Sequence, residues 1–257
     1  MPEECVVCGS KFVAYVRDVP TIGYYEHLPL YYCMECESFT NPSGFIPSKE
    51  TDKTELDFHI KVHERNLARS DALLSEISKH YPDLRSIVEI GCGTGTFIKA
   101  AQDSGLEAIG YDINEQAIAY GIEHYQANLS SEWWSADVQA TPFDMLFCIM
   151  VLEHLEQPRD LFSQMASAAK KFEAKVFVSV PTLNRNRWHY ILNPNPSRDG
   201  TPFFNNKAHV THFSNLGLQK LGTQFGATVK EVISQVSENE AGWRGFVYDF
   251  SESPQEI

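Results

Sequence analysis

The chain has 257 residues, of which 43% are hydrophobic, and its formal net charge at pH 7 is −13. This length allows one large domain and a smaller one, and no run of about 18 apolar residues suggests a membrane span. The acidic balance argues against a nucleic-acid partner, because proteins that bind polyanions usually carry a basic face. The N-terminus lacks the basic and apolar regions of a signal peptide, so we expect a cytoplasmic protein without membrane association.

Four of the six cysteines form two Cys-x-x-Cys pairs near the N-terminus. These are Cys5 with Cys8 and Cys33 with Cys36. In a reducing compartment such pairs indicate zinc ligands rather than disulfides, and four thiolates close a tetrahedral structural site. We therefore predict a zinc-binding module over residues 1–47, which the metal would help to fold. The alternative is a set of free or redox-active cysteines.

The next segments connect this module to the rest of the chain. Residues 20–26 are rich in aromatic side chains and could form part of a lid or pack within the module. Residues 48–82 carry apolar side chains three and four apart and end at a proline, which predicts a helical linker that could cover a ligand. His59 and His63 have the spacing of a metal-ligand pair, but a solvated helix face is the favoured interpretation.

A strand, a glycine-rich turn and a helix start follow in close succession. Residues 86–90 are apolar and branched, which suits a central strand of a parallel sheet. Gly91, Gly93 and Gly95 allow the backbone to turn sharply and to approach a ligand closely. Apolar residues at helical spacing then lead to Gly105, which is placed to end the helix. The helix N-terminus therefore points toward whatever lies over the glycines.

The spacing within and beyond this turn indicates the ligand. The pattern is G-x-G-x-G rather than the G-x-G-x-x-G of dinucleotide-binding folds. Asp112 lies 21 residues after Gly91 and suits a carboxylate that binds both hydroxyls of a ribose. Thr96 stands where a phosphate-binding loop has lysine, and Glu89 would repel a pyrophosphate. A ligand with a cationic end fits better.

The rest of the chain alternates between strand and helix patterns, which predicts an α/β fold with a mostly parallel sheet. Predicted strands cover 108–112, 133–138, 145–150 and 175–180, followed by a final antiparallel pair at 228–235 and 242–250. Predicted helices cover 115–124, capped by Asn114, then 160–171 and 214–225, capped by Ser214. An Asn- and Pro-rich insertion at 182–213 is interpreted as substrate-binding, and the tail 251–257 as disordered.

Four motifs in this order resemble those of the class I S-adenosylmethionine-dependent methyltransferases. The motifs are Glu89–Gly95, Tyr111–Asn114, Ala136–Val138 and Met145–His154, and the resemblance covers roughly 77–248. It implies a Rossmann-like, seven-stranded sheet over residues 83–250, mostly parallel with the last strand antiparallel. It also implies S-adenosylmethionine as cofactor, with Asp137 accepting from the adenine amino group and the backbone N–H of Val138 donating to the ring. The implied contacts are Glu89, Gly91, Cys92, Gly93, Thr94, Gly95, Asp112, Ile113, Asp137, Val138 and Met150.

A four-cysteine module ahead of such a domain is similar to bacterial methyltransferases of sugar and secondary-metabolite pathways. The resemblance therefore implies a small-molecule methyl acceptor, first of all a sugar or nucleotide sugar. One alternative is an RNA methyltransferase whose zinc module grips RNA. Another is a non-catalytic cofactor-binding protein whose zinc module docks a partner. The sequence does not define the oligomeric state, or whether oxygen, nitrogen or carbon is methylated.

A hydroxyl acceptor needs a general base. The first candidate is His154, which follows the fourth predicted strand and has an unperturbed pKa near 6.5; the alternative is that it only orders its loop. His209 and His212 are the second candidates, and Tyr190 in the insertion is a weaker one. Glu153 is expected to support the loop.

Overall fold

The computed structural model describes residues 2–20, 27–42, 49–182, 208–237 and 240–251. The chain forms two units, each assembled from separate stretches of sequence. The first contains Met1–Ile46, Met150–Ser163 and Val180–Gly226, and the second contains Pro47–Ile149, Gln164–Ser179 and Ala227–Ile257. Among the described helices, none combines the length and the hydropathy needed to span a bilayer.

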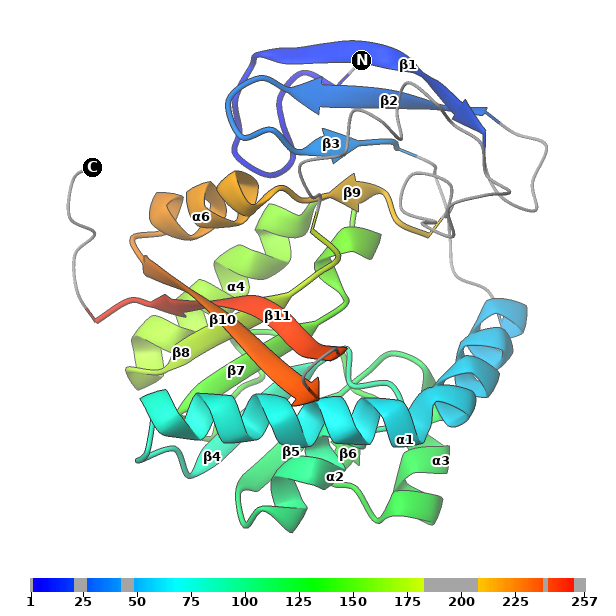
Figure 1. The fold of residues 1–257 in the computed structure, drawn as a ribbon, viewed down its shortest axis with the longest axis vertical. Coiled ribbons are helices and arrows are strands. Elements are labelled where there is room, and N and C mark those ends of the chain that lie inside the picture. The colour runs from blue at the N-terminus through cyan, green and yellow to red at the C-terminus, as the bar shows by residue number, and fades with distance from the viewer. Residues whose placement is uncertain (1, 21–26, 43–48, 183–207, 238–239, 252–257) are drawn as a thin grey trace. The chain divides into compact units, whose positions relative to one another are not determined.

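The second unit is built on a seven-stranded sheet with the order β10-β11-β8-β7-β4-β5-β6 (Figure 1). The strands are β4 (Ser86–Ile90), β5 (Glu107–Tyr111), β6 (Leu129–Ser130), β7 (Met145–Ile149), β8 (Lys175–Ser179), β10 (Thr228–Ser237) and β11 (Glu240–Asp249). Neighbours from β6 to β8 are parallel, whereas β11 is antiparallel to both β8 and β10. The predicted mostly parallel sheet with an antiparallel last strand is confirmed.

Burial explains why these strands occupy the centre. Every residue of β7 is buried, as expected for an apolar strand covered on both faces. Helix α1 (Lys49–His80) packs on β10, β11 and α2 (Thr96–Asp103), and its buried Leu73, Leu74 and Ile77 join the sheet core. Helix α3 (Glu115–Tyr125) begins at Asn114, whose side chain accepts the Ala117 N–H, so the predicted cap is confirmed.

The predicted third strand is wrong in position. Residues 133–138 form no strand; the strand is β6, which pairs with β5 at Tyr111 and Ser130. Trp134 is buried by a turn instead, and its indole N–H donates to Oε1 of Gln139 at 3.1 Å. Trp133 is exposed. The bulky apolar residues here belong to a packed turn. Over so few residues, the sequence pattern of such a turn cannot be distinguished from that of a strand.

The first unit holds a second sheet with the order β1-β2-β3-β9. The strands are β1 (Val13–Pro20), β2 (His27–Cys33), β3 (Phe39–Thr40) and β9 (Thr211–His212). Because β9 pairs with β3, the N-terminal module completes its sheet with a strand from much later in the chain. The module therefore gains apolar partners beyond its own short sequence.

A 3₁₀ turn and two helices also contribute to the described part of this unit. The 3₁₀ turn η1 (Leu152–His154) follows β7 and leads into α4 (Pro158–Phe172), which continues into the second unit. Helix α6 (Asn215–Gln224) begins at Ser214, whose hydroxyl accepts the Gly217 N–H as predicted. Most of the 182–213 insertion, the loop at 21–26 and the tail from 252 lie outside the described residues.

Candidate functional site

The glycine turn joins β4 to α2 in a conformation that excludes other residues. Gly91, Gly93 and Gly95 have φ values of 73°, 55° and 76°, in the left-handed region. A Cβ on Gly93 would lie 2.8 Å from Cε1 of His59, and one on Gly95 would lie 2.7 Å from Cδ2 of Leu129. No side chain caps the N-terminus of α2, which begins directly after the turn. Its first N–H groups are therefore left for a ligand or water.

Asp112 lies beside this turn because β4 and β5 are parallel neighbours whose carboxyl ends share one sheet edge. Its Oδ2 accepts the Gly93 N–H and its Oδ1 accepts the Asn114 N–H, both at 2.8 Å. An ionised carboxylate oxygen can accept a second hydrogen bond. The carboxylate is thus held by the backbone while one acceptor position on each oxygen remains, a pattern that suits two neighbouring hydroxyls.

Glu89 is the charged residue of β4 and is only 4% exposed. Its Oε2 has no hydrogen-bond partner among the described residues, nor has Oγ1 of the fully buried Thr94 in the turn. Burial, together with the charge of Asp112, raises the pKa of Glu89 well above its usual range. A buried polar atom without a partner costs free energy, so a cationic ligand group beside Glu89 would relieve this cost.

Cys92 has a different role from its neighbours in the turn. Its side chain is buried, and its Sγ would lie 2.7 Å from a Cβ on Gly110. Burial raises the pKa of the Cys92 thiol well above its usual range. The thiol therefore packs against β5 as a small apolar group, and only the backbone of Cys92 is available to a ligand.

The expectation that His59 and His63 lie on a solvated helix face is wrong. Both are partly buried on the side of α1 that faces the glycine turn. The His59 ring lies over Gly93, and burial lowers its pKa while the Asp112 charge opposes that shift. Nδ1 of His63 lies 3.1 Å from Oγ1 of Thr96, within hydrogen-bond distance. The sequence singled out both residues by their spacing, but the apolar pattern of α1 does not show which side of the helix faces the glycine turn.

The remaining predicted ligand contacts are exposed to different degrees. Ile113 and Val138 are 59% and 50% exposed, and Asp137 is also exposed. The Val138 N–H points to Oγ of Ser135 at 3.3 Å, so donating it to a ring would require this turn to open. Met150 follows β7 with a φ of 59° and belongs to the first unit.

The first unit brings two of the predicted base candidates together. The rings of His154 and His209 have centroids 4.8 Å apart and lie at 77° to each other. Nδ1 of His154 lies 2.8 Å from the carbonyl oxygen of Ala208. Because a carbonyl only accepts, Nδ1 carries the hydrogen and Nε2 of the neutral ring carries a lone pair.

Burial favours the neutral form of His154, His209 and His212. It lowers the pKa of His154 below its usual value, that of His209 to about 4 and that of His212 to about 3. His212 is only 3% exposed, and its Nε2 lies 2.8 Å from Oδ1 of Asn41. His212 thus ties β9 to the N-terminal module. Tyr190 lies outside the described residues.

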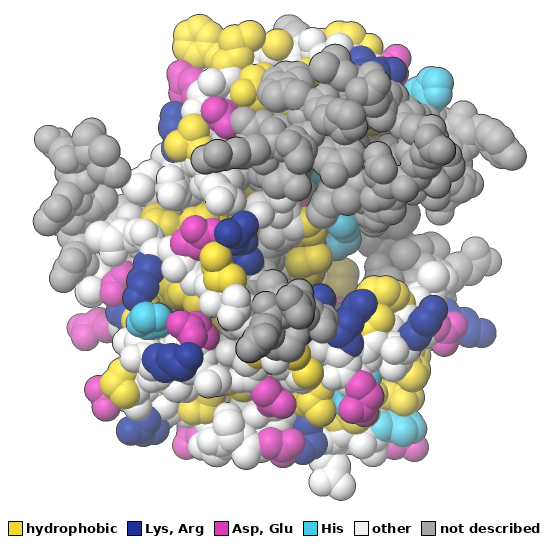
Figure 2. Space-filling view, in the orientation of Figure 1, with side chains coloured by type: hydrophobic (Ala, Val, Ile, Leu, Met, Phe, Trp, Pro, Cys, Tyr) yellow, Lys and Arg dark blue, Asp and Glu magenta, His cyan; other side chains and the backbone are white. Residues whose placement is uncertain are grey.

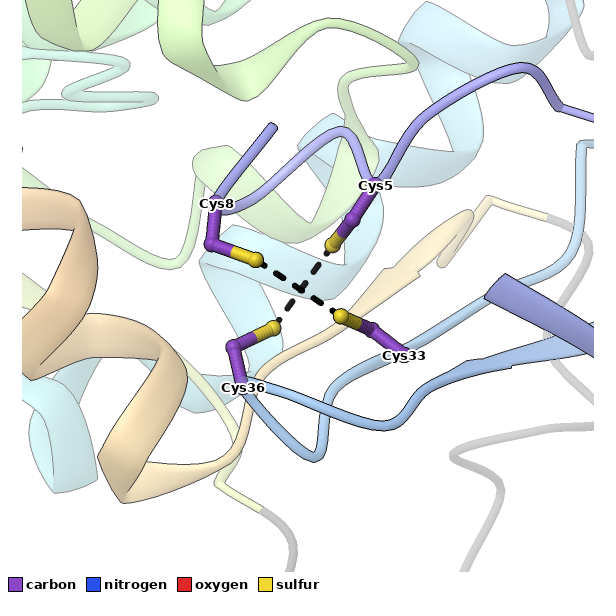
Figure 3. A group of neighbouring side chains, drawn as sticks. All are labelled: Cys5, Cys8, Cys33 and Cys36. Atoms are coloured by element: carbon purple, nitrogen blue, oxygen red, sulfur yellow. Dashed lines mark hydrogen bonds between the residues drawn. The ribbon is translucent and has the colours of Figure 1, made fainter. Parts of the chain in front are cut away.

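The four N-terminal cysteines form the candidate metal centre. Figure 3 shows their sulfur atoms pointing toward one another from two turns. The Cys5–Cys36 and Cys8–Cys33 sulfur pairs are each 3.6 Å apart, and all four sulfurs lie within 4.8 Å. Zinc–sulfur bonds of about 2.3 Å in a tetrahedron place the sulfurs roughly 3.8 Å apart. The four buried thiols, none of them in a disulfide, therefore fit one tetrahedral ion.

The two cysteine turns share one backbone geometry. The Gly9 N–H donates to the Cys5 carbonyl at 2.8 Å, and the Glu37 N–H donates to the Cys33 carbonyl at 3.0 Å. Gly9 and Glu37 both have positive φ, at 70° and 59°. This left-handed residue after each pair turns the chain so that both thiols face the same point. The second turn accepts the strain of a non-glycine residue there.

The chain is similar in sequence to known methyltransferases. A family model described as a methyltransferase domain matches residues 62–232. Among curated proteins, a ubiquinone biosynthesis O-methyltransferase of Methylococcus capsulatus is 32% identical over 116 residues, 42% of this chain and 47% of that protein. The Idiomarina loihiensis protein of the same name is 31% identical over 142 residues, 51% of this chain and 55% of that protein. The chain spans about half the length of these relatives.

Solved structures match over more of the chain. An O-methyltransferase family protein from Burkholderia thailandensis superposes with a TM-score of 0.56 at 13% identity, over 80% of this chain and 61% of that one. The plantazolicin methyltransferase BpumL, in complex with SAH, gives a TM-score of 0.54 at 13% identity, over 80% and 92% of the two chains. At 13% identity, this structural similarity shows a shared fold and nothing more specific.

Proposed function

Because the chain belongs to the methyltransferase-domain family, whose model matches residues 62–232, we propose that it transfers a methyl group from S-adenosylmethionine to a hydroxyl of a small molecule. The observation that carries the proposal is the pair of carboxyl groups beside the glycine turn: Asp112, with acceptor positions left on both oxygens, and the buried Glu89. S-adenosylmethionine supplies a methyl group on a sulfonium, which leaves as a neutral thioether without acid assistance.

Each residue of the second unit then has a role in holding the cofactor. Asp112 accepts hydrogen bonds from both ribose hydroxyls, and Asp137 accepts one from the adenine amino group. The exposed Ile113 offers an apolar surface to the base. Glu89 faces the cationic end of the ligand, where its charge compensates a positive group. Such alignment of the reacting atoms can lower the barrier by roughly 7–11 kcal/mol.

Glu89→Gln should weaken cofactor binding and abolish a proton release that accompanies it. The raised pKa favours the protonated form of Glu89 in the free protein. A cationic ligand favours the ionised form, so binding should release a proton and the affinity should rise with pH. Calorimetry in buffers of different ionisation enthalpy measures this release.

The exposed Glu115→Gln, in the first turn of α3, is the matched control and should retain both the affinity and the proton release. Equal proton release by the Glu89→Gln variant and the natural protein would show that Glu89 is not the group that loses the proton on cofactor binding.

A hydroxyl acceptor must lose its proton as it attacks, and the histidines of the first unit are suited to assist. His154 is neutral, and the Ala208 carbonyl fixes its tautomer so that Nε2 carries the lone pair. His209 lies against it and is the second candidate. His212 is buried in its bond to Asn41 and acts as a positioning residue. Tyr190 remains a candidate from the insertion.

His154→Ala should lower turnover by about 10²–10⁴-fold, the usual contribution of a general base. Cofactor affinity should change little, because the proposed ribose and sulfonium contacts belong to the second unit. His124→Ala, an exposed histidine of α3, is the matched control and should leave turnover unchanged. Release of S-adenosylhomocysteine measures turnover and calorimetry measures affinity. An unaltered rate in the His154 variant would make it a structural residue.

Oxygen is the proposed methyl acceptor because the matched curated proteins are named O-methyltransferases. Among hydroxyl compounds, sugars and nucleotide sugars are the first class to test, since the four-cysteine module resembles that of bacterial sugar methyltransferases. Incubation with labelled S-adenosylmethionine and a panel of sugars, nucleotide sugars and phenols tests this choice. Label in a sugar hydroxyl supports it, and label only in a phenol excludes the sugar class.

An RNA acceptor is disfavoured by the charge of the protein. The net charge is −13, and Figure 2 shows Lys and Arg side chains interspersed with Asp and Glu on the face in view. A protein that binds RNA needs several adjacent cationic side chains to neutralise the phosphates. Retention on RNA at moderate salt, or label incorporated into RNA, would favour this alternative.

The four cysteines are proposed to bind one structural zinc ion. Cys5, Cys8, Cys33 and Cys36 would all be ligands, which leaves no open position for chemistry. The Cys5–Cys36 and Cys8–Cys33 sulfur separations match those of a zinc tetrahedron to within a few tenths of an ångström. The ion would hold together two turns that are 25 residues or more apart in sequence.

A further inference from the structure

A second group of ligand atoms lies in the first unit, away from the four cysteines in sequence. Glu153, His154 and His209 each offer one oxygen or nitrogen atom, and these atoms lie within 4.8 Å of one another. We propose that these three side chains bind a divalent cation such as Zn²⁺, Fe²⁺ or Co²⁺. Two imidazoles with one carboxylate suit these ions better than Mg²⁺ or Ca²⁺, and they leave positions open for another ligand.

Two atoms that can only accept hydrogen bonds lie close together in this group, when Glu153 is ionised. Nδ1 of His154 is committed as a donor to the Ala208 carbonyl. Its Nε2 therefore has only a lone pair to present, and Oε1 of Glu153 lies 3.9 Å from it. This distance is too long for a hydrogen bond. Two acceptors at this separation repel unless a cation or a proton lies between them.

The Glu153 carboxyl group is deeply buried. The side chain is 2% exposed, and neither Oε1 nor Oε2 has a hydrogen-bond partner among the described residues. A proton could satisfy one oxygen only. An ion bound to the carboxylate compensates its charge as a whole, which buried carboxylates require. Support of the loop by Glu153 stays a prediction, and its backbone carbonyl accepts the Val210 N–H.

Hydrogen bonds to residues outside the cluster orient its members. A histidine that binds a metal usually donates its other ring N–H to a carbonyl or carboxylate, as His154 does. The Val210 N–H donates to the Glu153 carbonyl at 2.8 Å, and the Thr211 hydroxyl donates to the Leu155 carbonyl at 2.9 Å. These bonds join η1 to the residues around His209. The three ligands are thus held together by backbone contacts and not by chance proximity of loops.

Binding would draw the ligand atoms inward. Metal–ligand bonds of about 2.0–2.2 Å place neighbouring ligand atoms roughly 3–3.5 Å apart. Oε1 of Glu153 and Nε2 of His154, which lie 3.9 Å apart, would therefore move a few tenths of an ångström closer together.

The role of the ion rests on the proposed function. A hydroxyl oxygen of the acceptor would occupy an open position, where the cation lowers its pKa. Its proton passes to solvent, the oxygen lone pair forms the bond to the methyl carbon, and the carbon–sulfur electron pair returns to sulfur. In this arrangement His154 and His209 are metal ligands. The ion, instead of a histidine base, then promotes deprotonation of the acceptor hydroxyl.

The test uses the full chain after removal of weakly held ions with a chelator. Its zinc content, expected at one per chain from the four cysteines, is measured first. Co²⁺ is then titrated in by calorimetry, with absorption spectra recorded in parallel. We expect one Co²⁺ per chain, without the intense thiolate bands of a cysteine site. Glu153→Gln and His209→Ala should weaken it by at least about 100-fold, since loss of an outer partner alone costs 10–100-fold.

Two outcomes would overturn the metal site: no Co²⁺ binding by the natural protein up to millimolar concentration, or undiminished binding by both variants. His124→Ala should bind normally, and one retained zinc per chain reports that each variant has folded. The result is separable from the proposed function. If the protein binds Co²⁺ but transfers no methyl group, the metal site stands and the proposed reaction is rejected. If methyl transfer survives the chelator and the protein binds no Co²⁺, only the metal site is rejected.

Discussion

Asp112→Ala is expected to lower the affinity for S-adenosylmethionine by at least about 100-fold while the second unit stays folded. Two hydrogen bonds from ribose hydroxyls to a carboxylate contribute roughly 1.5–3 kcal/mol each, and 1.36 kcal/mol corresponds to a tenfold change. The carboxylate also holds the glycine turn through the Gly93 N–H. Its loss therefore removes both ligand contacts and the anchor of the turn that the ligand approaches.

Asp112→Asn refines this prediction. Each carboxylate oxygen accepts one backbone N–H, so an amide nitrogen would face a donor at either Gly93 or Asn114. We expect an intermediate loss of at least about tenfold, since one such bond to a charged group contributes roughly 1.5–3 kcal/mol. Glu107→Ala, at the exposed opposite end of β5, is the matched control and should bind normally. Calorimetry measures all three, and an unchanged affinity for Asp112→Ala would remove the ribose assignment.

Cys36→Ser is expected to eliminate zinc, to destabilise the first unit and to abolish turnover, while cofactor affinity stays within a few-fold. Structural zinc can supply on the order of 10 kcal/mol of folding free energy in small modules. The turn around Cys36 also holds later parts of the chain: its carbonyl accepts from the Ser214 hydroxyl, and the Ser214 N–H donates to Oγ of Ser38 at 3.2 Å. Loss of this turn should therefore disorder β9 and the adjoining His209.

Met34→Ser is the control, because Met34 lies between the two cysteines of the same turn and is 62% exposed. It should retain one zinc per chain and full turnover. Metal analysis, thermal unfolding and calorimetry with the cofactor separate the effects. A Cys36 variant that keeps its zinc, or one that loses cofactor affinity as severely as turnover, would contradict the account.

Local patterns were sufficient to predict the residues around the glycine turn. Glu89, the glycines and Asp112 follow from short stretches of sequence, because parallel neighbouring strands bring their carboxyl ends to one sheet edge. The cysteine pairs could also be predicted from local sequence, because the Cys-x-x-Cys spacing places both cysteines of a pair in one turn. The caps Asn114 and Ser214 are also local, and the structure confirms both.

Contacts between distant segments could not be predicted in this way. The pairing of β3 with β9 joins Phe39 to His212, and nothing in either short strand specifies the other. His59 faces the glycine turn because of how α1 packs on α2, although Phe58 and Ile60 beside it are exposed. Glu153 was predicted only to support its loop, because its proximity to His209 depends on the backbone hydrogen bond between Val210 and Glu153.

The most direct test of the central claim is a crystal structure of the protein with S-adenosylhomocysteine. The account predicts the ribose hydroxyls within hydrogen-bond distance of both Asp112 oxygens, with the amino acid end of the ligand toward Glu89 and the glycine turn. A ligand bound elsewhere, or a turn that instead holds a phosphate-bearing nucleotide, would contradict it.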